Sequence, residues 1–235
     1  MDFFRFPHTP HLIWLGQGAP RDDKVLSPAE AASLLSGRVR VEEKLDGANL
    51  GMSLGPSGAL RVQNRGQYLS EPYSGQFSRL GGWLRARVWQ WREQVTPNLI
   101  LFGEWCAARH SLDYASLPDW FLLFDVYDRD AQRFWSGTRR NDLADALHLA
   151  VVPTLHDGRA DLGQLTALVD TTNSRFRQGP LEGVVIRRES ADWCESRAKL
   201  VRAEFTQVIG EHWRGRAITW NQVRPDLRSG RSSGV

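Results

Sequence analysis

The segment from Val39 to Leu54 constrains the fold most, because it contains two strand patterns separated by a short polar stretch. Residues 39–44 alternate valine with charged side chains, the two-residue period of a half-buried strand, and this strand ends at Lys44. Residues 50–54 alternate in the same way, and the Gly-Pro-Ser-Gly sequence at 55–58 predicts a turn into a third strand. The sequence therefore predicts antiparallel strands around Lys44.

The rest of the chain mixes helical and strand patterns. Ser27 and Glu30 form a capping-box pattern around Pro28, so a helix is predicted from Pro28 to Leu35. Apolar residues spaced three and four apart predict an amphipathic helix from Gly75 to Gln94. Further strands are predicted at 60–62, 98–105, 120–128, 151–152, 181–188 and 197–201, and further helices at 139–149 and 161–169. This mixture predicts an α+β fold of antiparallel sheets flanked by helices.

Lysine is rare in this chain. The 30 basic residues include only Lys24, Lys44 and Lys199, and the others are arginine. An arginine guanidinium stays protonated in proteins, whereas a lysine amine can lose its proton and attack an electrophile. Lys44 lies where a predicted strand ends, and the Asp-Gly pair at 46–47 is a common turn signal. Two interpretations of Lys44 are therefore open, a nucleophile or a solvated charge that follows a strand.

Functional side chains lie near the ends of several predicted strands and form a set suited to nucleotide chemistry. The set contains an amine, cations for an α-phosphate, carboxylates for a hard metal ion and an aromatic ring for a base. Its members are Lys44, Asp46, Arg65, Glu104, Phe124, Asp125, Glu182 and Lys199. The sequence contains neither a P-loop pattern nor Gly-x-Gly-x-x-Gly, which disfavours those two modes of nucleotide binding.

Two pairs of residues suggest weaker alternatives. Cys106 and His110 lie four residues apart and could form a metal pair, although cysteine is more often a small buried residue. His8 and His11, in an extended lead-in to the first helix, could contact a substrate. A metal role for these two histidines is disfavoured, because no third ligand lies nearby in the sequence.

The order of five segments resembles that of the covalent nucleotidyltransferases, the superfamily of polynucleotide ligases and mRNA capping enzymes. Lys44-Leu45-Asp46-Gly47 resembles the nucleophile motif of that superfamily. The later motifs are matched by residues 102–105, 121–127, 182–186 and 199–201. Within the superfamily, Glu43 to Asn49 and Phe102 to Trp105 are most similar to ATP-dependent RNA ligases. The resemblance implies a nucleotidyltransferase domain.

The resemblance also implies a reaction at Lys44. The Lys44 amine would attack the α-phosphorus of ATP and form lysyl-AMP, the AMP would pass to an RNA 5′-phosphate, and an RNA 3′-hydroxyl would displace it. Phe124 would stack on adenine, Arg65 and Glu104 would hold sugar and phosphate, and Asn49 would order metal-bound water. By the same resemblance the catalytic residues are Lys44, Asp46, Glu182 and Lys199, the ligands of Mg²⁺ or Mn²⁺ are Asp46 and Glu182, and the nucleotide-binding residues are Glu43, Lys44, Asn49, Arg65, Glu104, Phe124, Arg197 and Lys199.

The cations of this site lead to an expectation about acidity. Lys199, Arg197 and a divalent metal ion are expected to lower the pKa of Lys44 by like-charge repulsion. Arg197 stands where RNA ligases often have lysine, and an arginine keeps the charge but changes the geometry.

Two further enzyme classes and one non-enzyme class remain as alternatives. A DNA nick ligase or an mRNA guanylyltransferase of the same superfamily would share the motifs. Only 34 residues follow Val201, too few for an appended OB domain, which favours an RNA ligase without one. A module that binds a nucleotide or nucleic acid without transferring a group is the third alternative, and the retained lysine and carboxylates argue against it.

Composition suggests the setting and the domain boundaries. The formal net charge is +3, and residues 213–235 carry five arginines against one aspartate. We therefore expect a nucleotidyltransferase domain at 1–212 and a basic, partly disordered segment at 213–235, suited to a polyanion. Two cysteines outside any Cys-x-x-Cys pair fit a reducing cytoplasm. The N-terminus lacks the pattern of a signal peptide, no membrane span is expected, and a monomer is the expected state.

Overall fold

A computed structural model of the chain describes residues 2–17, 20, 24–87, 91, 93–206 and 217–224. Its helices and strands are α1 Pro28–Leu35, β1 Arg38–Lys44, β2 Ala48–Leu54, β3 Leu60–Gln63, β4 Tyr68–Leu69, the 3₁₀ turn η1 Gly75–Phe77, α2 Leu80–Arg85, β5 Leu99–Trp105, β6 Phe121–Asp128, β7 Arg133–Phe134, α4 Gly137–Ala146, β8 Ala150–Val151, β9 Thr154–Arg159, α5 Leu162–Thr171, β10 Gly183–Glu189, β11 Cys194–Val201 and α6 Ala203–Thr206.

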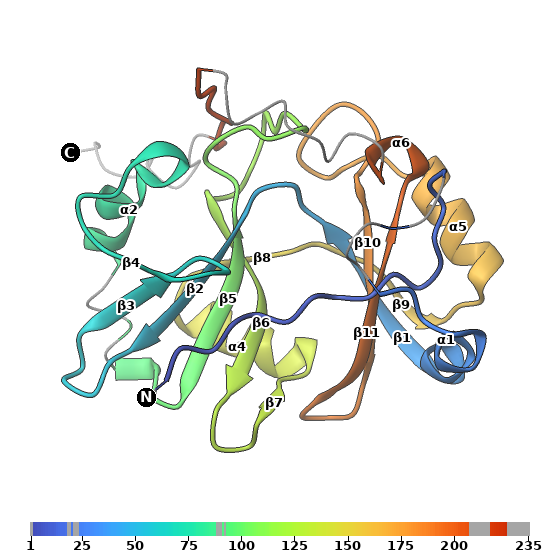
Figure 1. Cartoon of the computed structure of the whole chain (residues 1–235), viewed down its shortest axis with the longest axis horizontal. Helices are drawn as coiled ribbons and strands as arrows, with labels where there is room; N and C mark the ends of the chain where they lie inside the picture. Colours follow the sequence, from blue (N-terminus) through green and yellow to red (C-terminus); the bar gives the residue numbers. More distant parts are fainter. Residues whose placement is uncertain are drawn as a thin grey trace, which may run out of the picture.

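Two sheets organise the molecule (Figure 1). A four-stranded sheet has the order β11-β10-β1-β9, and a seven-stranded sheet has the order β4-β3-β2-β5-β6-β7 with β8 beside β6. Every ladder between these strands is antiparallel except that of β6 with β8. The predicted α+β fold of antiparallel sheets flanked by helices is therefore confirmed.

Each sheet buries one face against its own helices. Buried residues of α2 and α4 join the core of the seven-stranded sheet, and buried residues of α1 and α5 join the core of the four-stranded sheet. The predicted capping box of α1 is present, since Ser27 Oγ accepts from the Glu30 amide and Glu30 Oε2 accepts from the Ser27 amide. The helices thus cover one face of each sheet.

The prediction of one continuous helix from Gly75 to Gln94 is wrong, although Trp91, Glu93 and Gln94 are helical and the helix ends at Gln94 as predicted. Residues 75–77 form a 3₁₀ turn, α2 ends at Arg85 and a turn follows it, while residues 88–90 and 92 lie outside the described part of the chain. Gly75 has φ +57°, outside the helical region, and two further glycines at 81–82 weaken helix propagation. The apolar spacing nevertheless predicted burial correctly, because Phe77, Leu80, Leu84 and Trp91 are all buried.

Strand β9 is absent from the sequence prediction, and β11 begins three residues before the predicted Arg197. Strand β9 lies at the edge of its sheet and has no buried residue, so it lacks the apolar alternation that marks the other strands.

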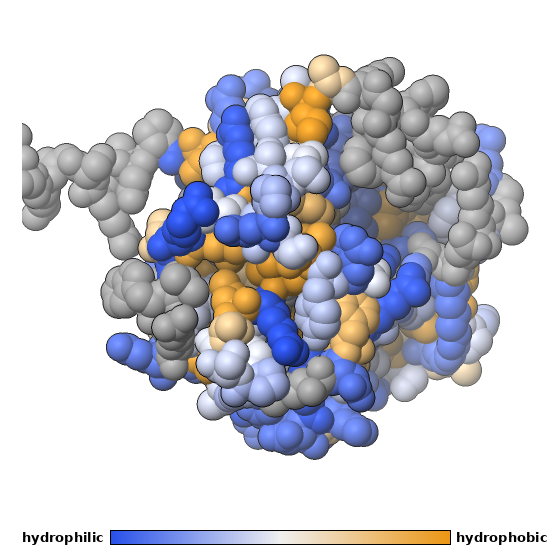
Figure 2. All heavy atoms as spheres, turned by 60° about the vertical axis from the view of Figure 1, so that its left-hand side comes forward, coloured by the Kyte–Doolittle hydropathy of each residue, from blue (hydrophilic) through white to orange (hydrophobic). Residues whose placement is uncertain are grey.

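The surface is mixed in polarity. In Figure 2, hydrophilic residues cover much of the side that carries α2 and β3, and apolar residues gather toward its middle. Among the residues that the structure describes, the exposed large hydrophobic ones are Tyr68, Leu162 and Ile218. No helix in this part of the chain is long and apolar enough to cross a membrane.

Part of the predicted C-terminal segment is ordered against the sheets. Asn221 is buried; its side chain accepts from the Tyr114 amide at 2.9 Å and donates to the Cys106 carbonyl at 2.8 Å. Residues 217–224 therefore pack on the loop that follows β5. The rest of the segment predicted at 213–235, including its expected disordered end, lies outside the described residues.

Candidate active site

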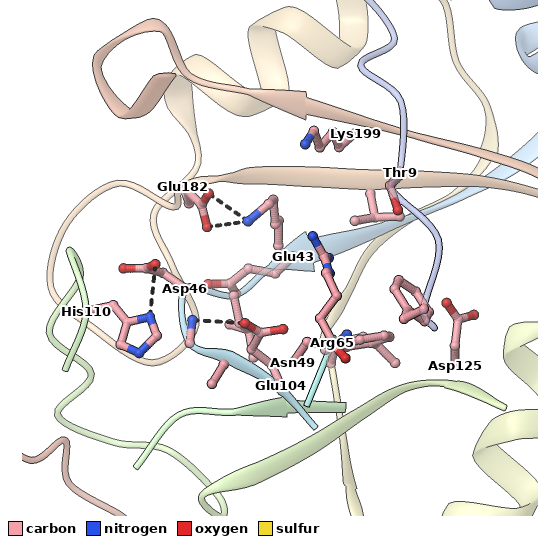
Figure 3. Close-up of a pocket in the computed structure, with 18 of the residues that line it drawn as sticks. Thr9, Glu43, Asp46, Asn49, Arg65, Glu104, His110, Asp125, Glu182 and Lys199 are labelled. Atoms are coloured by element: carbon pink, nitrogen blue, oxygen red, sulfur yellow. Dashed lines mark hydrogen bonds and ion pairs between the residues drawn. The ribbon is translucent and has the colours of Figure 1, made fainter. Parts of the chain in front are cut away.

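A pocket of about 1150 Å³ opens where the inner faces of the two sheets meet (Figure 3). The four-stranded sheet contributes Lys44 and Lys199, and the seven-stranded sheet contributes Glu104. The structure brings all the site residues predicted from the sequence to this pocket, namely Glu43, Lys44, Asp46, Asn49, Arg65, Glu104, Phe124, Glu182, Arg197 and Lys199.

Lys44 is held by a carboxylate at the centre of the pocket. Its Nζ donates to both carboxylate oxygens of Glu182 at 2.7 Å. The ladder pairs Lys44 with Gly183, where a Cβ would lie 2.3 Å from the Leu200 carbonyl oxygen, so only glycine allows these strands to approach. The interpretation of Lys44 as a solvated charge is therefore wrong: its side chain lies in a pocket and is ion-paired.

Among the protein's own groups, the lowering of the Lys44 pKa expected from Lys199 and Arg197 is not found. Burial is the largest influence and acts to lower the pKa of Lys44, but the carboxylates of Glu182, Glu104 and Asp46 outweigh it and raise the pKa. Arg197, one of the expected sources of repulsion, is itself paired with Asp125. Without bound substrate, the Lys44 amine is therefore protonated and ion-paired with Glu182.

Asp46 is fixed by the loop that follows β5. Its Oδ2 accepts from the Ser111 and Leu112 amides at 2.6 and 2.7 Å, and its own amide donates to Tyr114 Oη at 2.8 Å. The second oxygen, Oδ1, lies 4.0 Å from His110 Nδ1. Asp46 therefore reaches the pocket with one carboxylate oxygen anchored and the other directed toward His110.

Glu104 lies in the pocket with Lys44, and its carboxyl group has a raised pKa. Its Oε1 accepts from the Gly47 amide at 3.0 Å. Burial, and then the negative charges of Glu182 and Asp46, raise the pKa of Glu104 to about 7, although Lys44 and Arg65 oppose this. A carboxyl group with this pKa is typical of a functional site.

The raised pKa of Glu104 predicts a pH-dependent stability. Between pH 4.5 and about 7 the folded protein binds more protons at this group than the unfolded chain does, so the contribution of Glu104 to stability falls as pH rises through this window. Glu104→Gln should therefore gain about 1–3 kcal/mol relative to wild type between pH 5 and pH 8. Denaturant unfolding at both pH values measures this. Glu71→Gln on the exposed surface is the control, and an equal response of both variants would contradict the prediction.

Three more of the predicted residues divide into two groups. Glu43 is buried and its Oε2 accepts from the Arg175 amide at 3.0 Å, so it supports the loop at 174–175. In contrast, Asn49 Oδ1 is buried with no hydrogen-bond partner, as is Arg65 Nε. Buried polar atoms without partners are costly in a finished core and common where a ligand completes the site.

Comparison with known proteins identifies the family. The sequence profile of the RNA ligase family matches residues 37–201, which include every motif segment from Lys44 to Val201. The chain belongs to the RNA ligase family. No curated protein sequence matches it.

Solved structures of RNA ligases have the same fold. An archaeal ATP-dependent RNA ligase is 21% identical with a TM-score of 0.60, and the match covers 86% of this chain and 49% of that one. An RNA ligase mutant from Naegleria gruberi without ligand is 18% identical with a TM-score of 0.56, covering 74% and 52%. Another mutant of the Naegleria gruberi enzyme, with ATP and Mn, is 17% identical with a TM-score of 0.54 over the same shares. The chain thus spans about half the length of the structures it matches.

A divalent metal ion fits the oxygen donors of this RNA ligase fold. Within the described residues no three His, Cys, Asp or Glu side chains gather as a metal site, so a cage made of protein alone is absent there. Mg²⁺ and Mn²⁺ prefer oxygen, and Mg²⁺ usually keeps several waters beside one or two carboxylates and a phosphate. The carboxylates of Asp46 and Glu182 suit this partial shell, and the orphaned Asn49 Oδ1 suits a hydrogen bond from a metal-bound water. Cys106 is fully buried, as expected for a small buried residue, and His110 Nε2 lies 2.7 Å from Gln76 Oε1, so the structure gives no support to a Cys106–His110 metal pair.

Sequence reasoning named Asp125 and Arg197 but missed the buried charge network that joins them to Arg187, Glu42 and Arg140 at the pocket wall. Arg140 bridges both oxygens of Glu42 at 2.6 and 3.1 Å and donates to the Phe124 carbonyl at 2.7 Å. Arg187 donates to Asp125 at 2.6 Å, and Asp125 also pairs with Arg197. No signal in the sequence separates these arginines from the many others, because strand and helix patterns give no charge pairing.

Proposed function

We propose that this chain is the catalytic domain of an ATP-dependent RNA ligase that acts through Lys44. The main observation that supports this proposal is the pocket, which brings together the Lys44 amine, three carboxylates and a second lysine. The carboxylates are those of Asp46, Glu104 and Glu182, and the second lysine is Lys199. Membership of the RNA ligase family supports the reaction class, and the solved relative with ATP and Mn supports the nucleotide and the metal type.

In the first step the Lys44 amine attacks the α-phosphorus of ATP. A nitrogen–phosphorus bond forms and the bond from the α-phosphorus to the pyrophosphate oxygen breaks, while the Lys44 ammonium loses two protons to water, one before the attack and one as the phosphoramidate forms. Lys199 would neutralise the α-phosphate, Phe124 would stack on the adenine, and Arg65 with Glu104 would hold sugar and phosphate. The amine must first leave its ion pair with Glu182, which holds it protonated in the ligand-free protein.

Two transfers then complete the sealing reaction. An RNA 5′-phosphate oxygen attacks the phosphorus of lysyl-AMP, so the nitrogen–phosphorus bond breaks and Lys44 is restored. An RNA 3′-hydroxyl then attacks the 5′-phosphate, and AMP leaves. Asp46 and Glu182 would hold the divalent metal ion through oxygen, with Asn49 ordering a water; when bound, the ion neutralises negative charge on the phosphates. We propose a monomer in a reducing cytoplasm, in keeping with the two free cysteines.

The test is covalent labelling. The protein is incubated with Mg²⁺ or Mn²⁺ and ATP labelled at the α- or the γ-phosphate, then denatured and digested. The α-label should stay on a peptide that contains Lys44, the γ-label should be lost, and a metal chelator should prevent labelling. The absence of an α-labelled adduct would rule out the proposal.

Three further outcomes separate the remaining alternatives. Labelling by GTP in place of ATP would favour a guanylyltransferase. Sealing of nicked DNA faster than RNA with 5′-phosphate and 3′-hydroxyl ends would favour a DNA ligase. Nucleotide binding with no transfer from any nucleoside triphosphate would favour a non-catalytic binding module.

A further inference from the structure

The N-terminal strap, defined as residues 2–12, runs along the pocket from one sheet to the other (Figures 1 and 3). At the seven-stranded sheet, Gln63 Nε2 donates to the Phe4 carbonyl at 2.8 Å and the Phe4 ring stacks on Tyr127 at 3.7 Å. At the four-stranded sheet, the Lys199 amide donates to the Pro10 carbonyl, and the Leu12 amide donates to the Lys199 carbonyl, both at 2.8 Å. The strap therefore ties together the two halves of the pocket.

The middle of the strap faces the pocket. Phe6, His8 and Thr9 line it, and Phe6 is buried. The Phe6 ring meets the Phe124 ring edge to face, with centroids 5.3 Å apart. The guanidinium of Arg197 lies over the Phe6 ring at 4.7 Å. One side chain of the strap thus packs on two proposed nucleotide-binding residues.

Arg197 is held from several sides. Besides Phe6, its guanidinium contacts the Phe134 ring at 4.1 Å and pairs with Asp125. It lies two residues before Lys199 on β11, so the two cations point to the same face of the strand. Phe6 contacts both Arg197 and Phe124, so Arg197 lies toward the end of the pocket proposed for the base, while Lys199 lies close enough to Glu182 to act on its charge.

We propose that the N-terminal strap is one wall of the ATP pocket, with Phe6 as a positioning residue for Phe124 and Arg197 and with Thr9 facing the nucleotide. The proposal rests on the proposed function, because it takes ATP as the occupant. An edge-to-face aromatic pair and a cation over a ring each contribute only modestly, but both restrict the rotamers of residues that meet the ligand. Loss of the Phe6 ring should weaken nucleotide binding without removing any group from the reacting centre.

The test uses α,β-methylene ATP, an analogue that cannot transfer AMP, with binding measured by calorimetry. Phe6→Leu keeps most of the buried volume and removes the ring, and Thr9→Val keeps the shape and removes the hydroxyl. Both should raise the Kd of the analogue about three- to tenfold. Phe3→Ala is the matched control, because Phe3 belongs to the same strap but packs on Tyr68 and not on the pocket. Its Kd should stay within about twofold of wild type.

Adduct kinetics give a second measurement. In Phe6→Leu the ATP concentration for half-maximal labelling should rise, while the maximal labelling rate should change little. A purely structural role of Phe6 would lower the melting temperature and leave the ATP concentration for half-maximal labelling unchanged. Analogue binding by Phe6→Leu and Thr9→Val as tight as by Phe3→Ala would overturn the inference. If wild type binds the analogue but forms no adduct with ATP, the proposed function is rejected. The role of the strap in nucleotide binding is then still decided by the Kd values of the variants.

Discussion

Replacing Lys44 by alanine is expected to abolish the covalent protein–AMP adduct completely. The proposed reaction needs a deprotonated amine at the α-phosphorus, and the Lys44 amine donates to both carboxylate oxygens of Glu182 in the pocket. Labelling with ATP labelled at the α-phosphate, followed by denaturing electrophoresis, measures the adduct. An adduct of wild-type intensity in Lys44→Ala would reject Lys44 as the nucleophile.

The three lysines of the chain provide matched controls. Lys24 is exposed and pairs with Glu30 at 2.6 Å, so Lys24→Ala should label as wild type does. Lys199→Ala should retain Lys44 but slow the attack, because a cation proposed for the α-phosphate is lost. Loss of the adduct in Lys199→Ala together with its survival in Lys44→Ala would move the nucleophile to position 199.

Lys44→Arg separates chemistry from structure. Arginine keeps the positive charge beside Glu182, so the ion pair and the fold should persist. Its guanidinium does not lose its proton in proteins, so it cannot act as the nucleophile. Lys44→Arg should therefore melt near the wild-type temperature and form no adduct. Unfolding of this variant would show a structural requirement for lysine that the ion pair does not explain.

The sequence predicted the strands and the membership of the pocket well, and each success has a local cause. Alternation around Val39 and Val41 indicates one buried face, and Ser27 before α1 with Glu30 in its first turn indicates a cap; both signals need only neighbours in the chain. The pocket residues were assembled by resemblance to an ordered set of motifs. That resemblance carries long-range information which spacing alone lacks, and the structure places Lys44, Glu104 and Glu182 together as it implied.

The electrostatics could not be predicted from the sequence. The pKa of Lys44 is raised, not lowered, because the nearest charges are carboxylates, a fact that depends on distances across two sheets. The role of the strap was not predicted for the same reason. In the sequence Phe6 is one aromatic residue in an extended lead-in, and only the structure shows its contacts with Phe124 and Arg197. The charges of Glu42 and Arg140 lie 98 residues apart, and their pairing appears only in the fold.

Arg140→Ala is expected to cause the largest loss of stability of any variant considered. Arg140 and Glu42 have side-chain exposures of 0% and 2% and form a bidentate pair. Removing one partner of a buried pair leaves the other charge without compensation, which costs about 3–5 kcal/mol. For a chain of this size each kcal/mol lowers the melting temperature by about 2–4 °C. Calorimetric melting of wild type and variant measures the loss.

The exposed pair Arg85–Glu71 is the control, because a surface ion pair contributes at most about 1 kcal/mol and Arg85→Ala should melt near wild type. Glu42→Leu combined with Arg140→Met should cost less than Arg140→Ala alone, since no unpaired charge is then left between the sheets at that site. Arg140 also holds the Phe124 carbonyl at 2.7 Å, so the single variant should weaken nucleotide binding as well. A melting temperature for Arg140→Ala equal to that of Arg85→Ala would show that the Glu42 carboxylate is compensated without Arg140, with Arg187 as the nearest remaining cation.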